Sequence, residues 1–165
     1  MKYEQSRKMP YLALIDQLSR FIRQKSAFLI IAGYSFSDAH LNDTILNSLK
    51  ANPTAMVLAL MYDTYTITNK KNESVERYPR AYKLAENQHN LNIWTLDQAI
   101  IGTNIAEWGR SKETEEKEIL NFIESKKNDE TSEEMETQIK MGNFNIFADF
   151  LKILIGVEKE QDNVK

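Results

Sequence analysis

Residues 28–49 read FLIIAGYSFSDAHLNDTILNSL, and they carry the clearest secondary-structure signal in the chain. It starts with five apolar residues, turns at residues 33–37, and then spaces Leu41, Ile45 and Leu49 four apart. A continuous apolar run is typical of a strand buried on both faces, and the four-residue spacing is typical of an amphipathic helix. The stretch therefore predicts a strand, a tight loop and a helix.

The loop of this unit is a candidate ligand site. Gly33 stands where the strand ends, and a glycine there permits positive φ and a close approach of another molecule to the backbone. Ser37 or Asp38 can cap the helix that follows. Ligands of open α/β sheets bind at the carboxyl ends of strands, and helix N-termini favour anions. We therefore predict a nucleotide here, and the alternative is a plain turn that binds nothing.

A second strand is predicted over residues 56–62, and it completes a strand–helix–strand crossover with the first. Its continuous apolar character favours a parallel sheet that is covered on both faces. Tyr62 and Asp63 lie at its carboxyl end. By position, Tyr62 could stack on a base and Asp63 could accept a hydrogen bond from a ribose hydroxyl. The alternative for Tyr62 is a core aromatic at the end of the strand.

The whole chain divides into a predicted domain over residues 1–110 and a predicted helical extension over residues 111–165. The remaining predicted elements are a helix over residues 11–24 that starts after Pro10, a surface loop over 64–78, a short helix over 79–86, a last strand over 90–94, a glycine loop or plain turn near 102, a helix over 113–125, a charged flexible linker over 126–137 and a helix over 143–155. The last helix carries a dense phenylalanine stripe, so it must pack on its own domain or on a partner.

Composition excludes several classes of protein. The 165 residues are 42% hydrophobic and 27% charged, as expected for one soluble globular domain. The net charge of −3 gives no general argument for nucleic-acid binding, and the absence of cysteine excludes disulfides and cysteine metal sites. No apolar run approaches the roughly 20 residues of a membrane helix, and the first residues lack a signal-peptide core. We expect a cytoplasmic protein with no membrane partner.

The sequence shows no catalytic constellation and no metal site. The two histidines, His40 and His89, fall in separate predicted elements, and the chain has no HExxH, Walker or GxGxxG motif. His40 stands in the first turn of the helix after Gly33, where the helix dipole disfavours an imidazolium cation. It is therefore expected to contact a ligand or support the fold rather than act as a general base.

The wording of the loop adds a family resemblance. GYSFSDAHLN, residues 33–42, resembles the GYSF.D.HI signature of bacterial sirtuin-like proteins, many of which are anti-phage defence proteins that hydrolyse NAD. The segments 102–108 and 142–156 are similar to later parts of such proteins. The resemblance implies NAD as cofactor and a three-layer Rossmann-like α/β fold that contains a partial parallel sheet of three strands, flanking helices and a C-terminal helical extension. It also implies a set of dinucleotide-binding residues: Gly33, Tyr34, Ser35, Asp38 and His40, with Tyr62 and Asp63 near the adenosine end.

The resemblance covers only the C-terminal part of the family's domain. The family's glycine-rich NAD loop and its catalytic Asn and His lie upstream of this strand and are not found in these 165 residues. The implied parent function is NAD hydrolysis in antiviral defence, and the implied partners are NAD or a related nucleotide, the missing N-terminal half of the domain, identical chains in a homo-oligomer, and an ATPase of the same defence operon. The alternatives are a non-catalytic nucleotide sensor and a module that recruits partners through its phenylalanine-rich tail.

Overall fold

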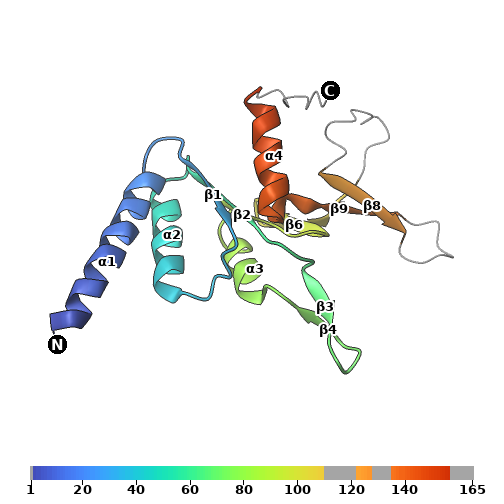
Figure 1. Cartoon of the computed structure of the whole chain (residues 1–165), viewed down its shortest axis with the longest axis horizontal. Helices are drawn as coiled ribbons and strands as arrows, with labels where there is room; N and C mark the ends of the chain where they lie inside the picture. Colours follow the sequence, from blue (N-terminus) through green and yellow to red (C-terminus); the bar gives the residue numbers. More distant parts are fainter. Residues whose placement is uncertain (1, 110–121, 128–134, 157–165) are drawn as a thin grey trace, which may run out of the picture.

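The computed structural model describes residues 2–109, 122–127 and 135–156 (Figure 1). The chain forms a mixed α/β fold around a five-stranded sheet in the order β1-β2-β5-β6-β7. The sheet strands are β1 (Phe28–Ala32), β2 (Met56–Leu60), β5 (Leu91–Trp94), β6 (Gln98–Ile101) and β7 (Asn104–Glu107). The helices are α1 (Lys2–Ile22), α2 (Ala39–Ala51), α3 (Pro79–Ala85) and α4 (Phe144–Leu154), with a 3₁₀ turn, η2, at Lys140–Gly142. Two separate hairpins pair β3 (Thr66–Thr68) with β4 (Ser74–Glu76) and β8 (Ile123–Lys127) with β9 (Met135–Ile139).

The predicted crossover unit and the three parallel strands are confirmed. Strand β1 pairs with β2 and β2 pairs with β5, both in parallel. The prediction that residues 90–94 form the last strand was wrong, because β6 and β7 extend the sheet in antiparallel fashion. Gly102 and Thr103 join them with φ values of +58° and +76°. Positive φ at both central residues is the geometry of a tight hairpin turn.

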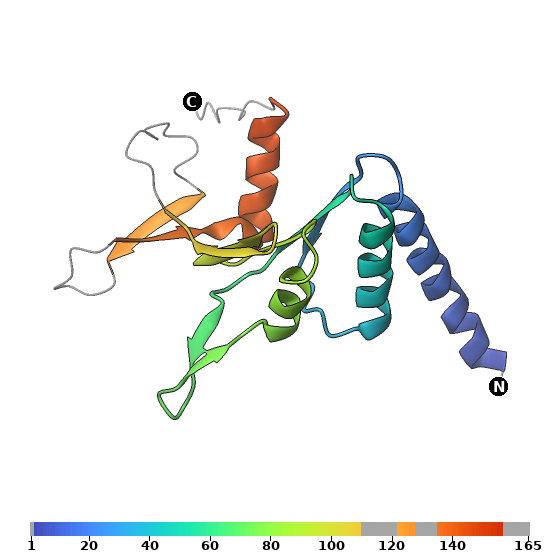
Figure 2. The same cartoon turned by 180° about the vertical axis from the view of Figure 1, so that it is seen from behind.

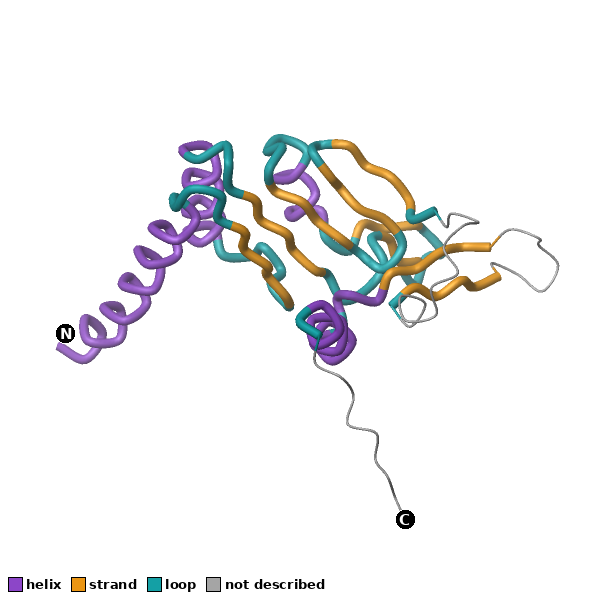
Figure 3. The backbone as a smooth tube through the Cα atoms, turned by 90° about the horizontal axis from the view of Figure 1, so that it is seen from above, coloured by secondary structure: helices purple, strands orange, loops and turns teal. Residues whose placement is uncertain are grey.

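Helices α1, α2 and α3 share one face of the sheet, and α4 lies on the other (Figure 3). Parallel strands that step in one direction with right-handed crossovers place their helices on the same face, which explains α2 and α3. The core on that face is made of side chains from the helices and from alternate strand positions: Ile22, Ile45, Leu49, Val57, Ala59, Tyr82, Ala85, Leu91 and Ile93. On the opposite face, Leu60, Phe122 and Met141 form a smaller cluster, against which Ile146, Phe147 and Phe150 of α4 pack.

Two predictions for residues 1–110 were wrong in detail. Helix α1 begins at Lys2, so Pro10 lies inside the helix and not at its start. Residues 2–9, KYEQSRKM, include several good helix formers, and they continue the helix on the N-terminal side of the proline. Residues 64–78 lie at the surface as predicted, but they form the β3–β4 hairpin rather than a loop without regular structure.

The helical extension predicted for residues 111–165 is partly wrong. Residues 123–125 belong to strand β8 rather than to a helix. Residues 126–127 and 135–137 belong to β8 and β9 rather than to a linker. The backbone pairing of the two strands over-rides the local helical composition around Ile123, and the buried side chain of Thr137 fits a packed strand. Residues 110–121 and 128–134 of these predictions lie outside the described residues. The last predicted helix is confirmed as α4, and Asn143 caps it by accepting from the amide of Asn145 at 3.0 Å.

None of the described helices combines the length and the apolar character that crossing a bilayer requires.

Candidate functional site

The loop over residues 33–38 connects the carboxyl end of β1 to α2. Gly33 has a φ of +72°, which favours glycine, and an added Cβ would meet nothing within 4 Å. The exposed hydroxyls of Ser35 and Ser37 lie 3.0 Å apart. The outer side of the loop is therefore open and lined by hydroxyl groups.

The inner side of the loop is filled by the protein's own side chains. Phe36 is 1% exposed and sits in the core although its backbone has a φ of +57°. The ring of Tyr34 lies against it at 4.7 Å, and the Tyr34 hydroxyl is 2.7 Å from Asn42 Oδ1. Asn42 in turn donates from Nδ2 to the Phe36 carbonyl at 2.9 Å. These contacts fix the loop to the first turn of α2, so a ligand can reach the loop only from its outer side.

Asp38 acts as the N-cap of α2, as the sequence allowed. Its Oδ1 accepts from the Leu41 amide at 3.1 Å, and its Oδ2 accepts from the Tyr11 hydroxyl at 2.9 Å. The Leu41 amide first, and then the Tyr11 hydroxyl, hold the pKa of Asp38 below its ordinary value. Because both carboxylate oxygens already have partners and carry negative charge, Asp38 itself would not contact a phosphate group. Asp38 therefore shapes the loop.

We expect Asp38→Ala to lower the melting temperature by roughly 2–5 °C at pH 7, because the cap of α2 and its link to α1 are both lost. Asp38→Asn keeps a capping oxygen and is the matched control, which should lose less. The lowered pKa means that the ionised cap stabilises the fold above pH 4 and that this contribution disappears as the pH falls through the lowered pKa. Thermal scans between pH 2 and pH 7 measure this; equal slopes for wild type and Asp38→Ala would contradict it.

The second group of predicted site residues follows β2. Tyr62 is 68% exposed, so the alternative prediction, a core aromatic at the end of the strand, was wrong. The Asp63 carboxylate lies 3.1 Å from Arg77 Nη1 and accepts from the Thr64 amide at 2.9 Å. Asp63 is therefore already held by the β3–β4 hairpin, and a ribose hydroxyl would have to share it with Arg77.

The structure places the two groups of predicted site residues at the same end of the sheet, beyond the carboxyl ends of β1 and β2. Ala32 at the end of β1 is paired with Leu60 at the end of β2. The chain leaves the two strands at the same level, one strand spacing of about 4.8 Å apart. His40 also lies at this end of the sheet, exposed in the first turn of α2. Its backbone carbonyl accepts from Thr44 Oγ1 at 2.8 Å. Among the residues that the structure describes, no cluster of three or more acidic or histidine side chains could hold a metal ion.

Sequence reasoning missed Arg80. This exposed arginine in the first turn of α3 donates from Nη1 to the Ser37 carbonyl at 3.4 Å, across 43 positions of sequence. It places a guanidinium beside a loop whose nearest carboxylate, Asp38, is already engaged. The sequence carries no signal for this contact beyond a basic residue next to Pro79 at the start of a helix.

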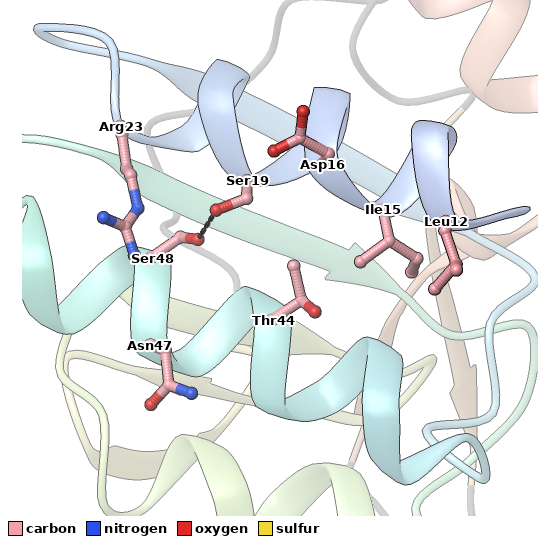
Figure 4. A pocket seen from close by; sticks show the side chains of 8 residues that line it. All are labelled: Leu12, Ile15, Asp16, Ser19, Arg23, Thr44, Asn47 and Ser48. Atoms are coloured by element: carbon pink, nitrogen blue, oxygen red, sulfur yellow. Dashed lines mark hydrogen bonds between the residues drawn. The ribbon is translucent and has the colours of Figure 1, made fainter. Parts of the chain in front are cut away.

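A groove of about 320 Å³ lies away from this loop, between α1 and α2 (Figure 4). Its lining residues are Leu12, Ile15, Asp16, Ser19, Arg23, Thr44, Asn47 and Ser48. The hydroxyls of Ser19 and Ser48 lie 3.0 Å apart across it, and Asp16 is paired with Arg20 at 2.8 Å. The groove contains none of the predicted site residues, and its polar groups join the two helices.

Neither the comparison with family models nor the comparison with curated proteins finds a match to this chain. The sirtuin-like resemblance of residues 33–42 therefore stays a prediction.

Proposed function

We propose that the outer side of loop 33–38, together with Arg80, binds the phosphates of a dinucleotide, with NAD as the expected ligand, in a sirtuin-like domain with a Rossmann-like sheet. The contact between Arg80 and the Ser37 carbonyl carries this proposal. It sets a cation beside exposed hydroxyls and an open glycine at the carboxyl end of a parallel strand, where nucleotides bind in such sheets.

The predicted residues then take different roles. Gly33 and Ser35 contact the ligand from the open side, while Tyr34 and Asp38 hold the loop in shape. His40 lies within the first turn of α2 and borders the same opening. On the neighbouring strand end, Tyr62 is exposed enough to stack on the adenine. The Asp63 carboxylate accepts from a ribose hydroxyl while it keeps its ion pair with Arg77.

The parent activity that accompanies this site is hydrolysis of NAD in bacterial antiviral defence. The described residues offer groups that bind and orient a dinucleotide, and the family's catalytic Asn and His would come from the missing N-terminal half of the domain. The chain alone is then expected to bind NAD without turning it over. A non-catalytic nucleotide sensor would share the site, and turnover of NAD by a protein that contains both halves distinguishes the two.

Titration of the ¹⁵N-labelled chain with NAD tests the site. We expect the amide signals of Gly33, Ser35 and Ser37 to shift, and Arg80→Gln to weaken binding about tenfold through loss of a charge-assisted contact. The matched control is Lys83→Gln, which removes a different exposed cation of α3. This variant should bind NAD as the wild type does. Unmoved loop signals in excess NAD would rule out the site.

The assembly alternative is favoured by the end of α4. Leu154 and Ile155 are 64% and 73% exposed, although the first turns of the helix pack on the sheet. Exposed apolar side chains gathered at one helix end mark an interaction surface. If this surface joins identical chains, the double variant Leu154→Glu, Ile155→Glu should halve the mass measured by light scattering, while Lys152→Glu should not. An unchanged mass in both variants would remove this alternative.

A further inference from the structure

The groove between α1 and α2 is held open by contacts between the two helices. The helices lie side by side, and α1 slants away from α2 toward its N-terminus (Figures 1 and 2). Beyond the wide end of the groove, the Tyr11 hydroxyl donates to the Asp38 carboxylate at 2.9 Å. Further along, the hydroxyls of Ser19 and Ser48 lie 3.0 Å apart. Because these two hydrogen bonds fix the spacing of the helices, the groove keeps its shape without a ligand.

One half of the groove is apolar. Leu12 is 58% exposed and Ile15 is half-buried, and both line the groove from α1. Thr44 lies opposite on α2, where its hydroxyl donates to the His40 carbonyl at 2.8 Å. In Figure 4 the methyl group of Thr44 points toward α1. This half therefore presents carbon surface that an apolar group would cover favourably.

The other half of the groove offers hydrogen-bond donors. The buried hydroxyl of Ser48 and the hydroxyl of Ser19 share one hydrogen bond, so one of the two keeps its hydrogen for another acceptor. The Arg23 guanidinium lies beside Ser48 (Figure 4). Within the part of the chain that the structure describes, the Arg23 side chain has no ion pair and no hydrogen bond. A guanidinium next to a donating hydroxyl favours an anion, and its paired N–H groups match the two oxygens of a carboxylate.

The carboxylate of Asp16 also borders the groove. It is paired with Arg20 at 2.8 Å, and in Figure 4 it points away from α2. The charges of Asp16 and Arg20 offset each other at the outer rim. Arg23 therefore supplies the remaining charge of the groove, and this charge is positive.

The size of the groove limits what it can hold. Its volume of about 320 Å³ is at the lower end of the range for small-molecule sites, about 300–1,000 Å³. Ile15 and Ser19 are four residues apart, so the apolar and polar halves are about 6 Å apart along α1. A short carbon chain with one charged end spans this distance. One turn of a partner helix, about 10 Å across, already exceeds the volume, so the groove suits a small molecule.

We propose that the groove between α1 and α2 binds a short-chain organic carboxylate. The carboxylate accepts from the Arg23 guanidinium and from the hydroxyl pair of Ser19 and Ser48. The carbon chain lies on Leu12, Ile15 and the methyl group of Thr44. This is a second ligand site, separate from the proposed nucleotide site, because none of these side chains belongs to loop 33–38.

Titration of the ¹⁵N-labelled chain with sodium hexanoate at constant ionic strength tests the proposal. We expect the amide signals of Ser19, Thr44 and Ser48 to shift and to saturate with a dissociation constant of about 1–10 mM, as suits a ligand of this size. Acetate keeps the carboxylate without the chain, and hexan-1-ol keeps the chain without the charge. Each of these two probes should bind about tenfold or more weakly than hexanoate.

Two variants assign the ends of the ligand. Arg23→Gln and Leu12→Gln change exposed side chains, so both proteins should fold, and each should weaken hexanoate binding about fivefold to tenfold. Lys25→Gln removes an exposed cation that does not line the groove and is the matched control, which should bind as the wild type does. Arg80→Gln should also leave hexanoate binding unchanged, so the outcome is independent of the nucleotide site.

Three results would overturn the proposal. The first is that the three amide signals stay unmoved at the highest soluble concentration of hexanoate. The second is that acetate or hexan-1-ol binds as tightly as hexanoate, because the groove would then recognise only a charge or only a carbon chain. The third is that Arg23→Gln binds hexanoate as tightly as Lys25→Gln does.

Discussion

Replacing Gly142 with alanine is expected to destabilise the fold by about 3 kcal/mol or more and to detach the C-terminal unit from the sheet. Gly142 lies in η2, directly against the end of β2. An added Cβ would overlap the carbonyl group of Met61 and come within 2.7 Å of the Tyr62 Cα. These backbone atoms directly follow β2, and the Met61 amide donates to the Trp94 carbonyl at 2.8 Å. A shift of this segment would break that hydrogen bond, and the Leu60, Phe122 and Met141 cluster would open.

Urea unfolding and tryptophan emission measure this effect. Trp94 packs against the cluster that η2 and α4 cover, so its emission should shift to longer wavelength when they detach. Gly156→Ala is the matched control: Gly156 has a φ of +71° but open space around it, so only a conformational cost of about 1 kcal/mol is expected. Equal losses for the two variants would show that the close approach of Gly142 to β2 is unimportant.

Truncation of Phe36 to alanine should cost about 3–5 kcal/mol and free the candidate loop. The ring is almost completely buried in the core beneath α2 and supports Tyr34. Without it, the loop loses its only fully buried anchor among residues 33–38. Amide exchange at Ser35 and Ser37 should therefore accelerate more than exchange in β5, which is separated from β1 by β2 in the sheet.

Phe36→Leu keeps most of the apolar volume and is the control, with an expected loss of under about 1.5 kcal/mol. If the loop also binds NAD, Phe36→Ala should weaken binding at temperatures where the fold persists, while Phe36→Leu should bind nearly as the wild type does. Retained stability in Phe36→Ala would mean that hydrogen bonds, such as those to Asn42 and Asp38, hold the loop without the buried ring.

Several elements could be predicted because their signals are local. The apolar run of β1, the four-residue spacing of α2 and the phenylalanine stripe of α4 each lie within one segment. The three antiparallel hairpins, β3–β4, β6–β7 and β8–β9, were missed for the opposite reason. β8 and β9 are polar segments separated by residues 128–134, and only their pairing makes them strands. The helix-like composition predicted for residues 113–125 did not indicate that pairing.

The candidate site divides in the same way. The local sequence was enough to predict that a glycine turn follows an apolar strand and that a serine or aspartate caps the next helix, because capping acts within three residues. The predicted burial of that strand on both faces was wrong, because β1 lies at the edge of the sheet and none of its residues is fully buried. Three features depend on how the helices pack and could not be predicted: Phe36 points inward, Tyr11 donates to Asp38 from 27 residues away, and Arg80 reaches Ser37 from α3. These contacts exist because α1 and α3 dock beside α2 on one face of the sheet. That docking depends on the total apolar surface that the helices and the sheet bury together. No periodic pattern along the chain shows which distant segments will pack against one another.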